Sequence, residues 1–180
     1  MKQLSLFAIL FLVYSCSESI SDSQVKAHNE VQYKNHIGKL EIIEGAEKRL
    51  QIIWEDGDTV TWSLPYDIYQ LRIEDFTQNG NDEILVGVVK KTKFDPNMNK
   101  RLFIFKIFEK EIRPLWMGSK VAYPLDHFTT KIMRDTAYII TREIKKQGDT
   151  LYGYYVNASF GISWIKHSQQ ISIKIQSDFQ

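Results

Sequence analysis

The chain contains the run Leu50-Gln51-Ile52-Ile53-Trp54-Glu55-Asp56-Gly57-Asp58-Thr59-Val60-Thr61-Trp62-Ser63-Leu64. Two segments rich in β-branched and aromatic residues flank a short acidic stretch that includes Asp56-Gly57. Asp-Gly between such segments is typical of the tight turn that joins two antiparallel strands. The run therefore predicts a β-hairpin and, with it, an antiparallel all-β fold.

The rest of the chain continues this pattern from Ile37 onward. Short apolar or alternating stretches are separated by turn residues at intervals of about ten residues, as in antiparallel β structure, and no long 3.6-residue period occurs. We expect further strands at Gln70–Glu74, Glu83–Val89, Arg101–Phe108, Ile112–Met117, His127–Met133, Ala137–Glu143, Leu151–Val156, Ser159–Lys166 and Ile171–Ile175. Lys90–Lys100 is predicted to be a polar, basic loop. A helix between His28 and Asn35 has only weak support from helix propensity, so the secondary structure of that segment is left open.

Composition limits the classes of function. The 180 residues are 43% hydrophobic and 25% charged, which is typical of one globular domain with an adequate core. Lys and Arg number 23 against 22 Asp and Glu, for a formal net charge of +1. Because a nucleic-acid backbone is bound through an excess of positive charge, nucleic acid is a poor candidate partner.

The N-terminus has the features of an export signal. Lys2 precedes an apolar run from Leu4 to Tyr14, which is too short to cross a hydrocarbon layer of about 30 Å. The run ends at Ser15 and Cys16, the only cysteine of the chain, and this junction resembles the lipobox of bacterial lipoproteins. An ordinary signal peptide with an incidental cysteine and an uncleaved anchor are the alternatives.

The resemblance implies that Cys16 carries a diacylglyceryl group, that the signal is cut before it, and that the new amino terminus is acylated. Residues 1–15 would then be the signal peptide, residues 16–27 the lipidated cysteine with a flexible tether, and residues 28–180 a single β-rich domain. Ser17 after the cysteine favours, by similarity to lipoprotein sorting rules, the outer membrane, with the domain facing the periplasm or the cell surface. Two or three acyl chains anchor a protein durably.

One loop carries a motif. Oxygen-bearing side chains alternate before the apolar run Ile84–Val89, at Asp75, Thr77, Asn79, Asn81 and Glu83. The loop resembles the calcium loops of FG-GAP and VCBS repeats, the blades of integrin-type β-propellers, and the likeness extends over about residues 72–119. The likeness implies a calcium site at these five residues, but with only two carboxylates among the five side chains we expect weak calcium binding or none, and no other cofactor. The alternative is a hydrogen-bonded turn that introduces a buried strand.

The chain length limits the number of blades. A blade of about 45 residues leaves room for three to four blades after the signal, so a complete ring is not expected. We therefore expect propeller-like blades in an incomplete propeller, with a β-sandwich as the alternative.

Signatures of catalysis are missing from the sequence. The four histidines are scattered, and no zinc-protease motif, nucleophile elbow, phosphate loop or dinucleotide motif occurs. Carboxylates suited to glycoside cleavage would have to converge in the fold. Asp126 and His127 are adjacent, so on a regular strand they would face opposite sides.

Aromatic residues suggest a binding surface. Tyr152 and Tyr154 share one strand face, and with Trp116 they are candidates for stacking on a ligand, although packing in the core is the commoner use of such rings. The first hypothesis is a membrane-anchored lipoprotein with a non-catalytic β domain that binds an envelope protein or glycan. The alternatives are an envelope hydrolase acting on polysaccharide or peptidoglycan, and a structural or assembly factor of the envelope.

Overall fold

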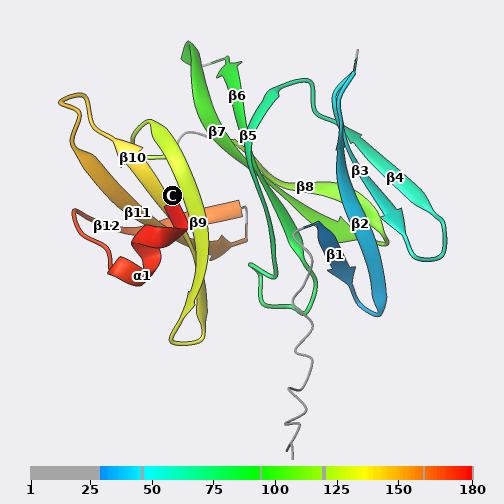
Figure 1. The fold of residues 1–180 in the computed structure, drawn as a ribbon. Coiled ribbons are helices and arrows are strands. Elements are labelled where there is room, and N and C mark those ends of the chain that lie inside the picture. The colour runs from blue at the N-terminus through cyan, green and yellow to red at the C-terminus, as the bar shows by residue number, and fades with distance from the viewer. Residues whose placement is uncertain (1–28, 46, 94, 119–120, 160, 180) are drawn as a thin grey trace, which may run out of the picture.

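The computed structural model describes residues 29–45, 47–93, 95–118, 121–159 and 161–179. In these residues the chain forms three four-stranded antiparallel sheets, each with its strands in sequence order. The antiparallel all-β prediction is confirmed, and each sheet has the meander of a propeller blade (Figure 1). The signal peptide, Cys16 and the tether predicted at residues 16–27 lie outside the described residues.

The strand boundaries follow the turn signals of the sequence. The first sheet holds β1 (Glu30–Tyr33), β2 (His36–Ile43), β3 (Arg49–Trp54) and β4 (Thr59–Ser63). The second holds β5 (Asp67–Glu74), β6 (Glu83–Thr92), β7 (Asp95–Phe108) and β8 (Glu111–Met117). The third holds β9 (Leu125–Met133), β10 (Thr136–Ile144), β11 (Thr150–Ala158) and β12 (Gly161–Ser168). A short helix, α1 (Ile173–Gln176), and a 3-10 turn, Ser177–Phe179, follow.

Two cores lie between the three sheets. The first and second sheets bury one cluster that includes Leu50 and Trp54 on one side and Val86 and Phe105 on the other. The second and third sheets bury another cluster, which includes Leu85 of β6 on one side and Phe128 and Ile139 of the third sheet on the other. Successive residues of β6 therefore enter different cores, which explains why Ile84–Val89 is an unbroken apolar run.

The outer faces of the stack differ. On the first sheet the outward positions are mostly polar, among them Lys39, Glu41, Gln51 and Thr61. On the third sheet, Ile140 and Tyr154 are covered by Ile175 and Phe179 of the C-terminal segment, and Figure 1 shows α1 beside this sheet. The stack thus ends in solvent on one side and under its own C-terminus on the other.

Two predictions of local structure are wrong, and one segment that the sequence left open is now assigned. Ile171–Ile175 is not a strand, since α1 forms there; Ile171, Ile175 and Phe179 recur every four residues, which is helical spacing. Within the segment that the sequence left open, Glu30–Tyr33 forms β1, which pairs with β2.

The second wrong prediction concerns Lys90–Lys100, which is not a loop: its two ends pair as strands. Lys90 pairs with Asn99, and Thr92 with Asp95, in a long β6–β7 hairpin. Pro96 is tolerated because β8 pairs with β7 only from Phe103 onward, so this part of β7 is an edge.

Candidate ligand-binding site

A pocket lies beside the part of β7 that extends beyond its pairing with β8. The first residue of β7 that pairs with β8 is Phe103, opposite Met117. Beside the unpaired part of β7 runs the segment Val121–Leu125, which leads from the second sheet into the third, and the two enclose a pocket of about 320 Å³. One wall is formed by Asp95, Asn97, Asn99, Lys100, Arg101 and Leu102, and the other by Val121, Tyr123, Pro124 and Leu125.

The β7 wall is a row of polar side chains at alternate positions, as the two-residue period of a strand requires. Oδ2 of Asp95 accepts hydrogen bonds from Nδ2 of Asn99 at 2.9 Å and from Nη2 of Arg101 at 2.6 Å. Oδ1 of Asp95 accepts one from the backbone N–H of Asn97 at 3.3 Å. The hydrogen bond from Arg101, followed by that from Asn99, lowers the pKa of Asp95, which keeps this side chain an ionised acceptor.

Arg101 has an unsatisfied donor. Its side chain is 4% exposed and is paired with Asp95, yet its buried Nε has no hydrogen-bond partner among the described residues. A buried guanidinium N–H without an acceptor costs free energy on the order of 1–3 kcal/mol. Because almost none of its surface is accessible, Nε is not a donor that a ligand in the open pocket reaches.

The opposite wall is held by a buried carboxylate. Glu143 of β10 is fully buried, and its Oε2 accepts the backbone N–H of Tyr123 at 2.8 Å. Its Oε1 accepts the hydroxyls of Thr141 at 2.5 Å and Tyr155 at 2.8 Å. Tyr155 in turn accepts the N–H of Ala122 at 3.2 Å, so two consecutive backbone groups of the pocket wall are fixed from inside the third sheet.

Gly153 makes room for this carboxylate. A Cβ on Gly153 would lie 2.4 Å from Oε1 of Glu143 and 2.7 Å from Oγ1 of Thr141. Gly153 pairs with Thr141 across the β10–β11 ladder. The absence of a side chain at position 153 is therefore a requirement of the Glu143 network.

Exposed aromatic rings flank the pocket. The Tyr123 ring, 36% exposed, lies 5.5 Å from the His167 ring, and the Trp164 ring, 55% exposed, lies 5.5 Å from it on β12. Nε1 of Trp164 donates to Nδ1 of His167 at 3.1 Å, and Nε2 of His167 lies 3.4 Å from Oε2 of Glu143. The Trp164 and His167 rings are thus oriented by hydrogen bonds, and the Tyr123 ring packs against His167.

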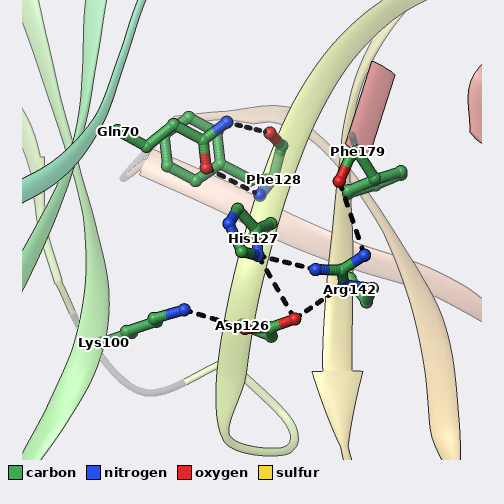
Figure 2. Close-up of polar contacts among 7 residues, drawn as sticks. All are labelled: Gln70, Lys100, Asp126, His127, Phe128, Arg142 and Phe179. Atoms are coloured by element: carbon green, nitrogen blue, oxygen red, sulfur yellow. Dashed lines mark hydrogen bonds and ion pairs between the residues drawn. The ribbon is translucent and has the colours of Figure 1, made fainter. Parts of the chain in front are cut away.

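A charged cluster joins the second sheet to the third beside the pocket (Figure 2). Asp126 of β9 accepts hydrogen bonds from Nζ of Lys100 at 2.8 Å and from Nε of Arg142 at 2.7 Å. Burial acts to raise the pKa of Asp126, but the hydrogen bonds from Lys100 and Arg142 outweigh it and hold the pKa well below its usual range. Gln70 adds a second link, because its side-chain amide bonds the backbone N–H and C=O of Phe128.

The expectation that Asp126 and His127 face opposite sides is wrong. His127 pairs with Arg142 and Leu125 with Glu143, so Asp126 is the extra residue of a β-bulge. A bulge interrupts the alternation of side chains. Nδ1 of His127 consequently lies 3.2 Å from Oδ2 of Asp126, and Figure 2 shows both side chains on the side of Arg142.

The predicted calcium loop is a network of hydrogen bonds. Asp75 accepts the N–H groups of Asn79 and Gly80 at 3.0 and 2.8 Å. Glu83 accepts the N–H and hydroxyl of Thr77 at 2.8 and 2.9 Å. Burial, the largest effect, raises the pKa of Glu83 to about 7.

Two further side chains of the loop, Asn81 and Gln78, reach the flanking sheets. Oδ1 of Asn81 accepts the N–H of Lys34 on β1 at 2.7 Å, and Oε1 of Gln78 accepts the N–H of Ala137 on β10 at 3.2 Å. The oxygens of the loop therefore already accept N–H and O–H donors, which fits the hydrogen-bonded turn. No group of three or more His, Cys, Asp or Glu side chains suited to a metal ion occurs in the described part of the chain. Weak calcium binding remains a prediction.

The predicted aromatic candidates lie in two different clusters. Tyr152 and Tyr154 share one face, as the strand period requires, and pack under the C-terminal segment, where Tyr152 contacts Phe179 with ring centres 5.7 Å apart. Trp116 packs instead in the core between the second and third sheets and contacts Gly161. The structure does not bring the three rings together.

The residues that line the pocket were not predicted as a site. The available signal was the alternation of Asp95, Asn97, Asn99 and Arg101, which is strand-like although the composition is loop-like. Tyr123 and Trp164 carry no local signal, because their position beside the pocket depends on how the second and third sheets stack.

Comparisons with family models, with curated proteins and with solved structures give no match. Within the described residues, none of the helical segments has the length and apolar character needed to pass through a bilayer.

Proposed function

We propose that the chain is a bacterial lipoprotein, anchored through Cys16 to the outer membrane, whose β domain is a non-catalytic binding module for an envelope component. The observation that carries the binding proposal is the pocket beside β7, whose polar wall includes Asp95, Asn97 and Asn99. The classes of partner are an envelope glycan and an envelope protein. The pocket favours the glycan, because its lining offers several hydrogen-bonding groups and an adjacent exposed ring.

The anchor is supported by the apolar run from Leu4 to Tyr14 and the single cysteine that follows Ser15. Replacing Cys16 by Ser removes the acceptor of the lipid. We expect the Cys16→Ser variant to move from the membrane fraction to the soluble fraction after cell lysis. Retention of this variant in the membrane fraction would contradict lipid anchoring.

The hydrolase alternative has less support from the carboxylates near the pocket. Both oxygens of Glu143 accept hydrogen bonds, and both oxygens of Asp126 contact cations. A general acid or nucleophile needs a carboxyl that can reach the substrate. These two carboxylates instead hold structural elements in place.

The binding proposal is tested with the full-length lipidated protein in detergent. Calorimetric titration with soluble peptidoglycan fragments and with purified envelope polysaccharide should give saturable heat for at least one of them, without new reducing ends. Release of reducing ends would contradict the non-catalytic binding proposal and support the hydrolase alternative. No binding to either glycan, together with binding to a purified envelope protein, would leave a protein-binding module.

A further inference from the structure

We infer that the pocket between β7 and Val121–Leu125 holds a neutral sugar unit, with hydroxyls bound by the Asp95–Arg101 row and the ring face bound by Tyr123. This inference rests on the proposed function and specifies its ligand. It uses three observations: the charge balance of the pocket, the arrangement of donors and acceptors, and the exposed ring beside them.

The charges that line the pocket are already balanced. Arg101 is paired with Asp95 at 2.6 Å, and Lys100 with Asp126 at 2.8 Å. An anionic ligand would have to displace Asp95 or lie beside its carboxylate, which the pKa lowered by Arg101 keeps ionised at neutral pH. A cationic ligand would meet Arg101 and Lys100. The charge balance therefore favours a ligand without net charge.

The hydrogen-bonding groups match hydroxyls. Asp95 is an acceptor, and the amides of Asn97 and Asn99 provide both donors and acceptors. Each hydroxyl of a sugar donates one hydrogen bond and accepts others, so neighbouring hydroxyls on one ring can engage a carboxylate and a side-chain amide together. The volume of about 320 Å³ is at the lower end of the range for small-molecule sites.

Tyr123 supplies the apolar contact. Its ring is 36% exposed and is supported from behind by His167 at 5.5 Å. The C–H face of a sugar ring packs against such a surface while its hydroxyls point to polar groups. Trp164 continues the exposed aromatic surface on the other side of His167 and would contact a second sugar unit of a longer chain.

An extended peptide added to the edge of β7 is the rival ligand. Strand addition draws specificity from pockets that receive alternate side chains. The β7 wall instead offers Asp95, Asn97, Asn99 and Arg101, which suit hydroxyls better than apolar side chains. The peptide is accordingly an outcome of the test.

The test uses full-length protein in detergent and four probes: the methyl glycosides of glucose, galactose, mannose and N-acetylglucosamine. Ligand-observed NMR and calorimetry should show saturable binding of at least one probe. The Tyr123→Ala variant should weaken it about tenfold or more, from lost aromatic contact. Asn97 is exposed, so Asn97→Ala leaves folding intact and should weaken binding about threefold to tenfold by loss of one hydrogen bond.

Matched controls are Phe108→Ala and Asn157→Ala, because both residues are exposed and neither lines the pocket. Both should bind as the wild type does. The inference is overturned if all four probes fail to bind, or if Tyr123→Ala and Asn97→Ala bind the probes as the wild type does. It is also overturned if methyl glucuronide or a polyvaline-type extended peptide binds the pocket better than the neutral probes. Failure of the four probes with continued binding of envelope polysaccharide would refute the neutral sugar unit alone, whereas loss of all envelope ligands would refute the proposed function too.

Discussion

Replacing Gly153 by Ala should destabilise the protein strongly, although it adds one methyl group. The new Cβ would lie 2.4 Å from Oε1 of Glu143, and Cβ atoms essentially never approach within 3.0 Å of another heavy atom. Glu143 and Thr141 are both buried, so the carboxylate must shift and its hydrogen bonds from Thr141 and Tyr155 must lengthen. Overpacking costs about 1–3 kcal/mol, and one weakened hydrogen bond to a charged group about 1.5–3 kcal/mol.

We therefore expect the free energy of unfolding to fall by about 3–4 kcal/mol, a large part of the 5–15 kcal/mol typical of a domain. Urea denaturation followed by tryptophan fluorescence measures it: with a slope near 2 kcal/mol per molar, the midpoint should drop by roughly 1.5–2 M. Gly45→Ala is the matched control, because a Cβ there meets nothing within 4 Å. If the urea midpoint of Gly153→Ala equals that of Gly45→Ala, position 153 does not require a residue without a side chain, and this prediction is refuted.

Three further changes test other parts of the structure. Burial raises the pKa of Glu83 to about 7 from 4.5, so its contribution to stability is complete below pH 4.5 and is lost as the pH rises through 7. Wild type should lose stability between pH 5 and 8 relative to Glu83→Gln, and parallel unfolding curves would contradict this. Asp126 has a lowered pKa, so its contribution is present above pH 3.8 and is lost in acid. Asp126→Asn should cost about 1–3 kcal/mol at pH 7 and clearly less at pH 2, where part of the contribution has been lost, and an equal cost at both pH values would argue against the ionic cluster. For the loop at Asp75, calorimetry and thermal shift at millimolar Ca²⁺ should detect at most weak binding, which Asp75→Ala would abolish, and no heat and no shift in the wild type would remove the metal site.

Local signals predicted most of the strands. Asp56-Gly57 marked the β3–β4 hairpin, in which Ile53 pairs with Thr59, because a tight turn of this type depends on a few neighbouring residues. The apolar run Ile84–Val89 indicated a strand covered on both faces, and the two cores confirm that it is.

The site could not be predicted in the same way, because its parts are distant in sequence. Glu143 bonds Tyr123, Tyr155 and His167, which lie 12 to 24 residues away. Their convergence depends on the register of β10 with β11 and on the bulge at Asp126, and one inserted residue changes which side chains face inward. Lys90–Lys100 was misread because its charged composition outweighed its two-residue alternation.

The loop between β5 and β6 has a consequence for how the molecule unfolds. In an ordinary row of repeated units each unit touches only its neighbours, so the terminal ones can detach separately. Here one loop of the central sheet is hydrogen-bonded to both flanking sheets: Asn81 accepts the N–H of Lys34, and Gln78 accepts the N–H of Ala137. Releasing either flank disturbs the segment that secures the other, and we expect the three units to melt in one cooperative transition.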